Sequence, residues 1–502
     1  MKILTMYLPQ FHRVKENDEW WGDGYTDWVS ARNAVPLYEG HYQPHVPLNR
    51  NYYDLTEKAA LEWQASLMKQ YGIDGQCIYH YWFKDGRQIL ERPAERLLEW
   101  KEIDMPFCFS WANQSWANSW SAVKGANVWC DVRENTQSDK NDNGLLLEQS
   151  YGDEGEWRRH FEYLLPFFQD ERYIKVDNKP VFVLYQAMYI TVLGEMAECW
   201  NAWAEEEGFQ GIYFIGASNR DESLVDAVLH PGPQAVMSEM LAELKSPGLK
   251  ILDYESVWER MIDKAYTETE SMAGAFVGYD DTPRRGNRGC VIDNASPEIF
   301  KSNLLRLLAI NAAHSQPFTF INAWNEWGEG MHLEPDEKTG TAYLEAVCYA
   351  KKHYCEYLEE VRQIEKTYYS KQKKEIAYYK NKIIRFECYW RIMDKWLSLK
   401  ESKRTVADLL EEKNIYKIAV YGVGMLGRHL IQDLSGSNIK IVCAIDRNEI
   451  MEKYDFPVIG TDERIPAADA LIVTPSYDFP GIKESMMGKG VDNIISLEAL
   501  FG

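Results

Sequence analysis

The sequence predicts an α/β protein with a large barrel and a smaller second domain. We place a (β/α)8 TIM-type barrel at residues 1–350, a helical connector at 351–415 and a Rossmann-like parallel-sheet domain at 416–502. The length of 502 residues exceeds what one hydrophobic core usually serves. Short apolar runs alternate with amphipathic segments before residue 325, which is typical of parallel strands joined by crossover helices. A glycine-rich turn between two apolar runs follows near residue 422.

Eight apolar runs are the predicted barrel strands, and eight is the number that closes a barrel of this kind. The first run carries one positive charge and is shorter than a secretory signal, so a buried strand is favoured over a signal peptide. The predicted strands are 3–8, 75–82, 106–111, 180–185, 212–217, 235–239, 274–279 and 318–324.

Polar and aromatic side chains follow several of these runs. Because barrel enzymes collect their chemistry at the carboxyl ends of the strands, we expect a functional site there. A purely structural barrel has no need for such groups at one end. The groups are Gln10 and His12, His80-Tyr81-Trp82, the segment 111–116, Tyr185-Gln186, Tyr279-Asp280-Asp281 and the segment 325–329.

The composition favours a carbohydrate ligand over a nucleic acid. The chain holds 18 Trp and 31 Tyr, whose flat faces and single polar handles suit sugar rings, although large aromatics also fill cores. The formal net charge of −22 would repel a phosphate backbone. We therefore expect no generic nucleic-acid binding.

Cysteine usage and hydropathy indicate a cytoplasmic protein. Nine cysteines are scattered without a CxxC pair, which is typical of reduced thiols and implies no metal site. No uncharged apolar stretch is long enough for a membrane-spanning helix.

The connector differs electrically from the rest of the chain. Residues 351–404 hold 15 Lys or Arg against 8 Asp or Glu, interleaved with aromatic residues. The stretch 371–400 has the ingredients of a helix that lies on an anionic surface, such as the inner face of the membrane. The competing interpretation is that its aromatic residues pack on the barrel or on a partner helix and its lysines are merely solvated.

The predicted second domain begins with a strand, a glycine turn and a helix. Gly422, Gly424 and Gly427 fit a turn that brings backbone N–H groups close to a phosphate at a helix N-terminus. Asp446 follows the next strand, where an acid would hold a ribose hydroxyl. A nucleotide or dinucleotide is the candidate cofactor of this domain, and a role in assembly is the alternative.

Two carboxylates, Glu326 and Glu329, are the predicted catalytic residues. Glycosidic-bond chemistry uses such a pair, with one group protonating the departing oxygen. Among 77 acidic residues the Glu-x-x-Glu spacing alone means little. The context is more specific, because the pair follows a predicted strand, has Trp324 and Trp327 beside it, and has two glycines, 328 and 330, that allow a tight turn.

The segment 318–335, FTFINAWNEWGEGMHLEP, resembles the active-site signature of the WbsX-like glycosyltransferases, which are related to glycoside hydrolase family 99. The resemblance covers about residues 1–350. The other matching blocks are Tyr7 to His12, Trp20-Trp21-Gly22 through Asp27-Trp28, His41 to His45, Tyr79 to Phe83, Ser110 to Asn113, and Asp281 to Arg284.

The resemblance implies a barrel without a required cofactor and roles for both glutamates. In family 99 hydrolases, which act on α-mannosides, the first Glu assists the sugar 2-hydroxyl and the second is acid and then base. This chain has Gly328 where those hydrolases typically place His. Strand ends and matching blocks together predict the substrate-binding residues Tyr7, Gln43, His80, Trp82, Trp111, Asn113, Tyr185, Trp327 and Glu334.

The leading functional prediction is a glycosyltransferase of cell-surface polysaccharide synthesis, such as O-antigen or capsule. It would act on an oligosaccharide or lipid-linked glycan with a nucleotide-sugar donor, although no clear donor motif is present in the barrel. An intracellular endo-glycosidase or transglycosidase acting on α-mannoside-like linkages is the alternative. A carbohydrate-binding scaffold without activity is a third interpretation, which the retained Glu pair disfavours. The sequence does not indicate an oligomeric state.

Overall fold

The computed structural model describes residues 1–117, 145–217, 224–244, 248–447 and 454–501. The chain forms two compact units, Met1–Ser370 and Lys371–Gly502, and each unit has a hydrophobic core of its own.

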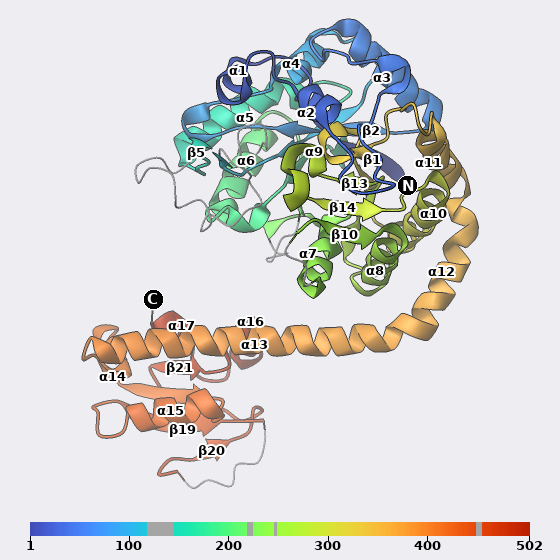
Figure 1. Cartoon of the computed structure of the whole chain (residues 1–502). Coiled ribbons are helices and arrows are strands. Elements are labelled where there is room, and N and C mark those ends of the chain that lie inside the picture. Colours follow the sequence, from blue (N-terminus) through green and yellow to red (C-terminus); the bar gives the residue numbers. More distant parts are fainter. Residues whose placement is uncertain (118–144, 218–223, 245–247, 448–453, 502) are drawn as a thin grey trace. The chain divides into compact units, whose positions relative to one another are not determined.

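The first unit is a closed barrel of parallel strands (Figure 1). The seventh strand is interrupted at Gly274, so its first part pairs with β9 and its second part pairs with β15, which closes the ring. The strands are β1 (Lys2–Tyr7), β2 (Gly75–His80), β3 (Phe107–Trp111), β7 (Lys179–Leu184), β8 (Tyr213–Ala217), β9 (Ala227–His230), β11 (Ser271–Ala273) with β12 (Ala275–Phe276), and β15 (Phe318–Asn322). The predicted barrel is confirmed.

Two predicted strands are wrong in detail. The run 235–239 lies in helix α7 (Gln234–Glu243), where Val236, Met237 and Met240 share the buried face with helical spacing. The sixth strand is the shorter β9 instead. The run 274–279 begins too late, because the strand starts at Ser271, and its last residue belongs to β13 (Tyr279–Asp280) in a separate three-stranded sheet.

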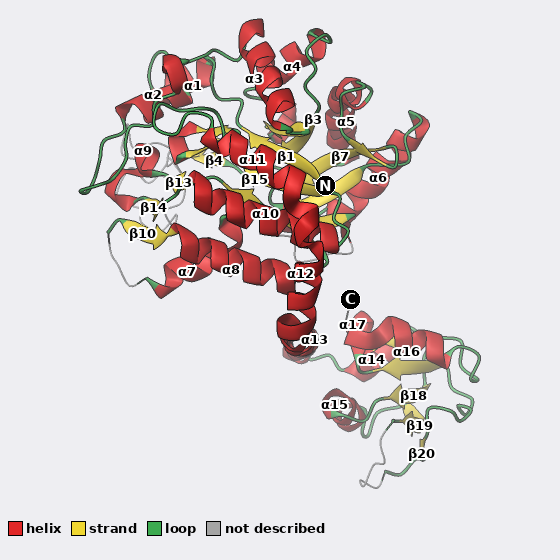
Figure 2. Ribbon diagram, turned by 90° about the vertical axis from the view of Figure 1, so that its right-hand side faces the viewer, coloured by secondary structure: helices red, strands yellow, loops and turns green. Residues whose placement is uncertain are grey.

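Helices surround the barrel (Figure 2). The larger ones are α3 (Lys58–Tyr71), α4 (Arg92–Glu99), α5 (Glu154–Phe168), α6 (Leu193–Glu206), α8 (Tyr254–Thr267), α10 (Pro297–Ala313), α11 (Ala342–His353) and α12 (Leu358–Ile364). The smaller elements at the strand ends include α1 (Lys15–Trp21), α2 (Asp27–Asn33), β4 (Trp116–Ala117), β5 (Leu145–Leu147), β6 (Lys175–Val176), β10 (Lys250–Asp253), α9 (Thr282–Arg285), β14 (Cys290–Asp293), β16 (Asn325–Glu326) and β17 (Met331–His332). Several of these loop elements contribute to the walls of the candidate site.

Alternation along the strands decides which side chains enter the barrel. Tyr79, Ser110 and Val183 line one small interior cavity. Tyr79 and Ser110 are register partners, as are Ser110 and Val183. Because successive side chains of a strand point to opposite faces, the next residues, His80 and Trp111, point outward toward the helices.

The second unit holds a five-stranded parallel sheet in the order β20-β19-β18-β21-β22. This is the 3-2-1-4-5 order of a doubly wound fold, in agreement with the predicted parallel-sheet domain. Its elements are α13 (Ser370–Glu401), α14 (Val406–Glu412), β18 (Lys417–Tyr421), α15 (Met425–Asp433), β19 (Lys440–Ile445), β20 (Val458–Ile459), β21 (Ala470–Val473), α16 (Phe479–Met486), β22 (Ile494–Ser496) and α17 (Leu497–Leu500).

The described cysteines form no disulfide, and most of them are buried. The ninth, Cys130, lies outside the described residues. No helix in the described part of the chain is both long and apolar enough to cross a membrane.

Candidate active site

A cavity of about 390 Å³ opens at the carboxyl ends of the barrel strands. It is lined by residues just beyond or at the ends of β1, β2, β3, β7 and β15, where the sequence predicts a site. Among its lining residues are Gln10, Trp21, Tyr25, Asp27, Tyr79, Tyr81, Trp116, Tyr185, Lys250, Tyr279, Arg284, Arg285, Arg288, Glu326 and Glu329. Aromatic rings and charged groups both line this cavity. The combination suits a sugar, whose apolar faces stack on rings while its hydroxyls need polar partners.

Glu326 and Glu329 lie on a tight turn between β16 and β17. Asn325 holds this turn to the first strand, because its side chain accepts a hydrogen bond from the Leu8 amide and donates one to the Leu8 carbonyl, at 2.8 and 2.9 Å. Gly330 ends the turn at φ 61°, in the left-handed region that glycine adopts without strain. The spacing of the two glutamates thus places both at one cavity.

Arg284 joins the two carboxylates. Its Nη1 donates to Oε1 of Glu329 at 2.5 Å, and its Nη2 donates to Oε2 of Glu326 at 3.2 Å. The guanidinium is only 12% exposed and keeps its charge at every accessible pH. One largely buried cation therefore faces two acids that are at most 18% exposed, so the cluster carries too much negative charge for both to ionise easily.

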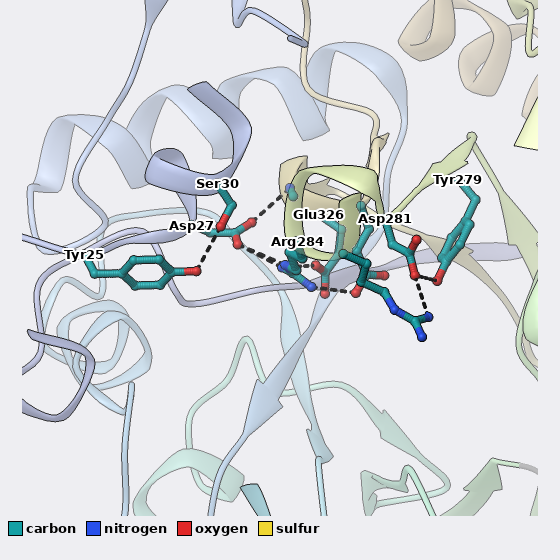
Figure 3. Close-up of polar contacts among 10 residues, drawn as sticks. Tyr25, Asp27, Ser30, Tyr279, Asp281, Arg284 and Glu326 are labelled. Carbon is teal, nitrogen blue, oxygen red and sulfur yellow. Dashed lines mark hydrogen bonds and ion pairs between the residues drawn. The ribbon is translucent and has the colours of Figure 1, made fainter. Parts of the chain in front are cut away.

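Asp27 is the third acid of this cluster (Figure 3). Its Oδ1 accepts from Nη2 and Nε of Arg284 at 2.9 and 3.2 Å, and its Oδ2 accepts from the Gly328 amide at 3.0 Å. A Cβ at position 328 would lie 2.7 Å from Arg284 Nε and 2.8 Å from both Asp27 oxygens. Glycine is therefore required here by the ion pair, which gives a physical reason for the departure from the hydrolase pattern.

Burial raises the pKa values of both glutamates, and neighbouring acids add to it. The pKa of Glu326 rises to about 8, chiefly through burial and then through the charge of Glu329, while Arg284 opposes the shift. Burial also raises the pKa of Glu329, again against Arg284. The pair therefore keeps a proton near neutral pH, as an acid catalyst requires.

A comparison with protein families assigns this barrel. The family model described as Glycosyltransferase WbsX matches residues 3–347, which include the whole cluster of Asp27, Arg284, Glu326 and Glu329. The chain belongs to the WbsX glycosyltransferase family. The barrel at residues 3–347 is therefore of the carbohydrate-active, glycosyltransferase type that this family describes.

Individual relatives of this WbsX-family chain add little on activity. An uncharacterised protein named WxcX from two strains of Xanthomonas campestris pv. campestris is 30% identical over 357 residues, which cover 68% of this chain and 48% of WxcX. The chain thus spans about half the length of these curated relatives.

Solved structures similar to the WbsX-family chain include a GH99 endo-α-mannosidase from Bacteroides thetaiotaomicron, at 13% identity and a TM-score of 0.42 over 72% of this chain and 98% of that one. An exo-β-1,4-mannosidase from an Opitutaceae bacterium is similar at 10% identity and a TM-score of 0.35, over 94% of this chain and 72% of that one.

Of the predicted substrate-binding residues of the WbsX-family barrel, Tyr185 lines the cavity. His80 and Trp111 point outward, and His80 stacks on His160 and Tyr163 of α5. Trp82 stacks on the same His160, with ring centroids 4.5 Å apart. The prediction took every polar or aromatic group after a strand as inward, whereas the alternation places only every second one there.

The other predicted ligands hold loops in place. Gln43 donates to Asp280, and Asn113 ties the end of β3 to the backbone of Gln186. Tyr7 donates to Gln64 of α3, on the helix side of the barrel. Trp327 is a buried residue of the turn itself and stacks on His332. Each is a neighbour of the site that supports its walls.

Glu334 lies beside the turn that carries Glu326 and Glu329. Its carboxylate accepts hydrogen bonds from Tyr53, Gln64, Trp324 and Trp327, all at 2.7 or 2.8 Å. Burial raises its pKa to about 7, although these four donors favour the ionised form. It thus anchors the two tryptophans that flank Glu326, and it has no place on the cavity wall.

Sequence reasoning assigned no role to several cavity residues. Asp27 and Arg284 stand in matching blocks, but their meeting joins segments 257 residues apart. Tyr79 precedes the predicted His80 by one position, and strand alternation would have identified it. One wall of the cavity is basic and consists of Lys250, Arg285 and Arg288. No local sequence motif predicts it.

One group of described side chains has metal-ligand chemistry. His45, His332 and Asp336 each place a ligand atom within 4.8 Å of the others. However, His45 Nδ1 and His332 Nε2 are 2.8 Å apart, a hydrogen-bond distance. Two nitrogens bound to tetrahedral zinc at about 2.0–2.1 Å would lie roughly 3.3 Å apart. The present geometry is therefore that of a hydrogen-bonded pair.

The glycine turn of the second unit is shaped by close contacts. A Cβ at Gly427 would lie 2.0 Å from the Gly422 carbonyl oxygen, and Gly422 has φ 85°. Gly424 precedes helix α15 and has open space around it. Asp446 accepts a hydrogen bond from the Val423 amide at 2.9 Å, so the turn itself engages this carboxylate. Nucleotide binding here stays a prediction.

Proposed function

We propose that this WbsX-family enzyme is a glycosyltransferase of cell-surface polysaccharide synthesis, with Glu326 and Glu329 as its catalytic carboxylates. The observation that carries the proposal is the buried pair of glutamates on one aromatic-walled cavity, bridged by Arg284. A buried acid pair that holds one proton is suited to breaking and forming a bond at a sugar carbon.

The proposed chemistry uses the pair in two steps. Glu326 accepts the proton of the sugar 2-hydroxyl while that oxygen attacks C1, and Glu329 protonates the departing oxygen. The acceptor hydroxyl then attacks C1, returning a proton to Glu329, and Glu326 reprotonates the 2-oxygen. Arg284 lies closer to Glu329, which favours the proton on Glu326 before a sugar binds. Sugar binding must therefore shift this proton to Glu329.

The basic wall of the cavity supports an activated donor. Arg285 pairs with Asp281 at 2.9 Å, whereas Lys250 and Arg288 form no ion pair with any carboxylate of the described residues. The Lys250 amide donates to the Gly289 carbonyl at 3.2 Å, so the two basic residues lie on adjoining backbone. In a chain of net charge −22, such a wall suits the diphosphate of a nucleotide-sugar or of a lipid-linked glycan.

The test is incubation of the purified chain with labelled nucleotide-sugars and acceptor oligosaccharides, and separately with α-mannosyl oligosaccharides, followed by mass analysis. A lengthened product supports transfer. A shortened product supports the endo-glycosidase or transglycosidase alternative, and no product with any substrate would remove the catalytic proposal. A second test removes the basic wall. The double variant Lys250→Ala with Arg288→Ala should raise KM for a diphosphate donor at least about tenfold and leave kcat nearly unchanged.

We place this activity at the cytoplasmic face of the membrane, where a lipid-linked acceptor would reside. The support is the basic cavity wall of Lys250, Arg285 and Arg288, which suits an anionic substrate, together with the basic connector.

A further inference from the structure

Helix α13 has two apolar faces. Cys388, Ile392 and Trp396 are buried in the hydrophobic core of the second unit. The apolar residues on the far side are Tyr379, Ile383, Phe386, Trp390 and Leu397, which are 58, 56, 62, 69 and 57% exposed. Single exposed apolar residues are ordinary, but a continuous row on one helix is typical of an interaction surface. We call these five residues the α13 stripe.

The α13 stripe follows a heptad repeat. Its successive spacings are four, three, four and seven residues, which is the a and d pattern of a coiled coil. Ile376 occupies the preceding a position, and Met393 occupies the remaining d position at the edge of the domain core. A helix that rests on a globular core or lies in a lipid interface presents a broader apolar face than an a and d seam. The narrow stripe therefore favours a second helix over a lipid surface.

Charges beside the stripe specify how two copies would align. Glu375 and Lys382 occupy g positions, while Lys380 and Glu387 occupy e positions. In a parallel pair each g residue meets the e residue five positions later on the partner helix. Glu375 then meets Lys380, and Lys382 meets Glu387, so both contacts are attractive and each occurs twice by symmetry. We propose that α13 pairs with the α13 of a second copy of this chain as a parallel coiled coil.

The length and setting of the helix suit this pairing. Residues 376–397 cover three heptads, about 33 Å of helix. Isolated helices of this length are marginal in water. Here the later part of the opposite face, from Cys388 to Trp396, is already packed in the core of the second unit, so part of the ordering entropy is spent before association. Pairing would hold two copies of the enzyme together without using the cavity residues.

The first test measures mass in solution by light scattering or sedimentation at micromolar concentration. We expect a dimer for the full chain and a monomer for Ile383→Glu combined with Trp390→Glu. Ile384→Glu is the matched control, because Ile384 is 53% exposed but lies off the stripe. A monomeric wild-type chain, or equal dissociation by the control, overturns the proposal, and circular dichroism verifies that each variant is folded.

Charge exchange and cross-linking test the orientation. Lys382→Glu should raise the dimer dissociation constant at least about tenfold, and adding Glu387→Lys should restore it. Tyr379→Cys should give a disulfide-linked dimer on oxidation, whereas Tyr378→Cys, at a similarly exposed neighbour off the stripe, should not. In an antiparallel pair centred on the stripe the two residues 379 would lie about 20 Å or more apart. Failure of Tyr379→Cys to cross-link therefore overturns the parallel arrangement.

The predicted membrane contact of residues 371–400 is a competing use of the same helix. Sedimentation with vesicles of phosphatidylserine and phosphatidylcholine, against phosphatidylcholine alone, distinguishes the two. A wild-type chain that is monomeric and binds only the anionic vesicles would assign the stripe to lipid and overturn the dimer proposal. A dimer whose stripe variants dissociate supports it.

Discussion

Asp27 and Arg284 form a buried ion pair at the wall of the cavity, with Arg284 Nη2 2.9 Å from Asp27 Oδ1. Asp27 begins helix α2 after the first strand, and Arg284 lies in α9, 257 residues later. The pair directs the remaining N–H groups of Arg284 toward Glu326 and Glu329. It therefore sets the charge and the position of both carboxylates.

Glu326→Gln and Glu329→Gln are each expected to lower kcat at least about a hundredfold, the usual scale for loss of a positioned acid or base. The amide keeps the volume of the side chain but cannot exchange the proton. The measurement is initial rates with the substrate identified by mass analysis. Glu337→Gln is the control and should retain full activity, because the Glu337 side chain is 45% exposed and pairs with Arg50 instead of lining the cavity. Near-normal activity of either cavity variant would exclude that residue from the mechanism.

The pH profile should report the shared proton. Because the pKa of Glu326 is raised to about 8, kcat/KM should fall above about pH 8, where the pair loses its last proton. Arg284→Met removes the charge that lowers this pKa and should move the alkaline limb upward. Asp27→Asn removes a charge that raises it and should move the limb downward. Shifts of the same sign in both variants would contradict this electrostatic account.

The raised pKa of Glu326 also has a cost in stability. The carboxyl is protonated in both states below about pH 4.5, but above that pH the folded chain resists its ionisation. Stability is therefore lost as the pH rises toward 8, at about 1.4 kcal/mol for each unit of pKa shift. Glu326→Gln should melt at a higher temperature than the wild-type chain at pH 8.5 and nearly equally at pH 5. Calorimetry at the two pH values measures this, and a variant less stable at pH 8.5 would refute it.

Gly328→Ala should separate Asp27 from Arg284, because the new Cβ would lie 2.7 to 2.8 Å from their polar atoms. Overpacking of this kind typically costs about 1–3 kcal/mol, and we expect kcat to fall at least about tenfold as the guanidinium shifts. Gly248→Ala is the control, since a Cβ there meets no atom within 4 Å. Unchanged activity of the 328 variant would mean that Arg284 need not hold its present position.

The glycines of the turn in the second unit should differ in how much the fold depends on them. Gly427→Ala should destabilise this unit by about 1–3 kcal/mol, because its Cβ would overlap the Gly422 carbonyl. Gly424→Ala should leave the fold intact because the space around it is open. Hydrogen exchange of β18 and β19 in each variant measures the difference. Equal protection in both would show that the turn adapts to a side chain at 427.

Local sequence patterns were sufficient for the barrel, the parallel sheet of the second unit and the turn that carries Glu326 and Glu329. Strand-forming runs and a glycine-containing Glu-x-x-Glu turn depend on interactions between near neighbours, which the sequence displays directly. Where two runs were both short and apolar, as at 227–230 and 235–239, only packing against the barrel decided between strand and helix.

The tertiary structure alone decided which side chains meet. A shift of one residue along a strand reverses the direction of a side chain, so Tyr79 enters the cavity while His80 packs on α5. The ion pair of Asp27 and Arg284 depends on closure of the barrel, which brings the first and last thirds of the unit together. No local pattern encodes such a contact, because its energy is realised only when both segments are already in place.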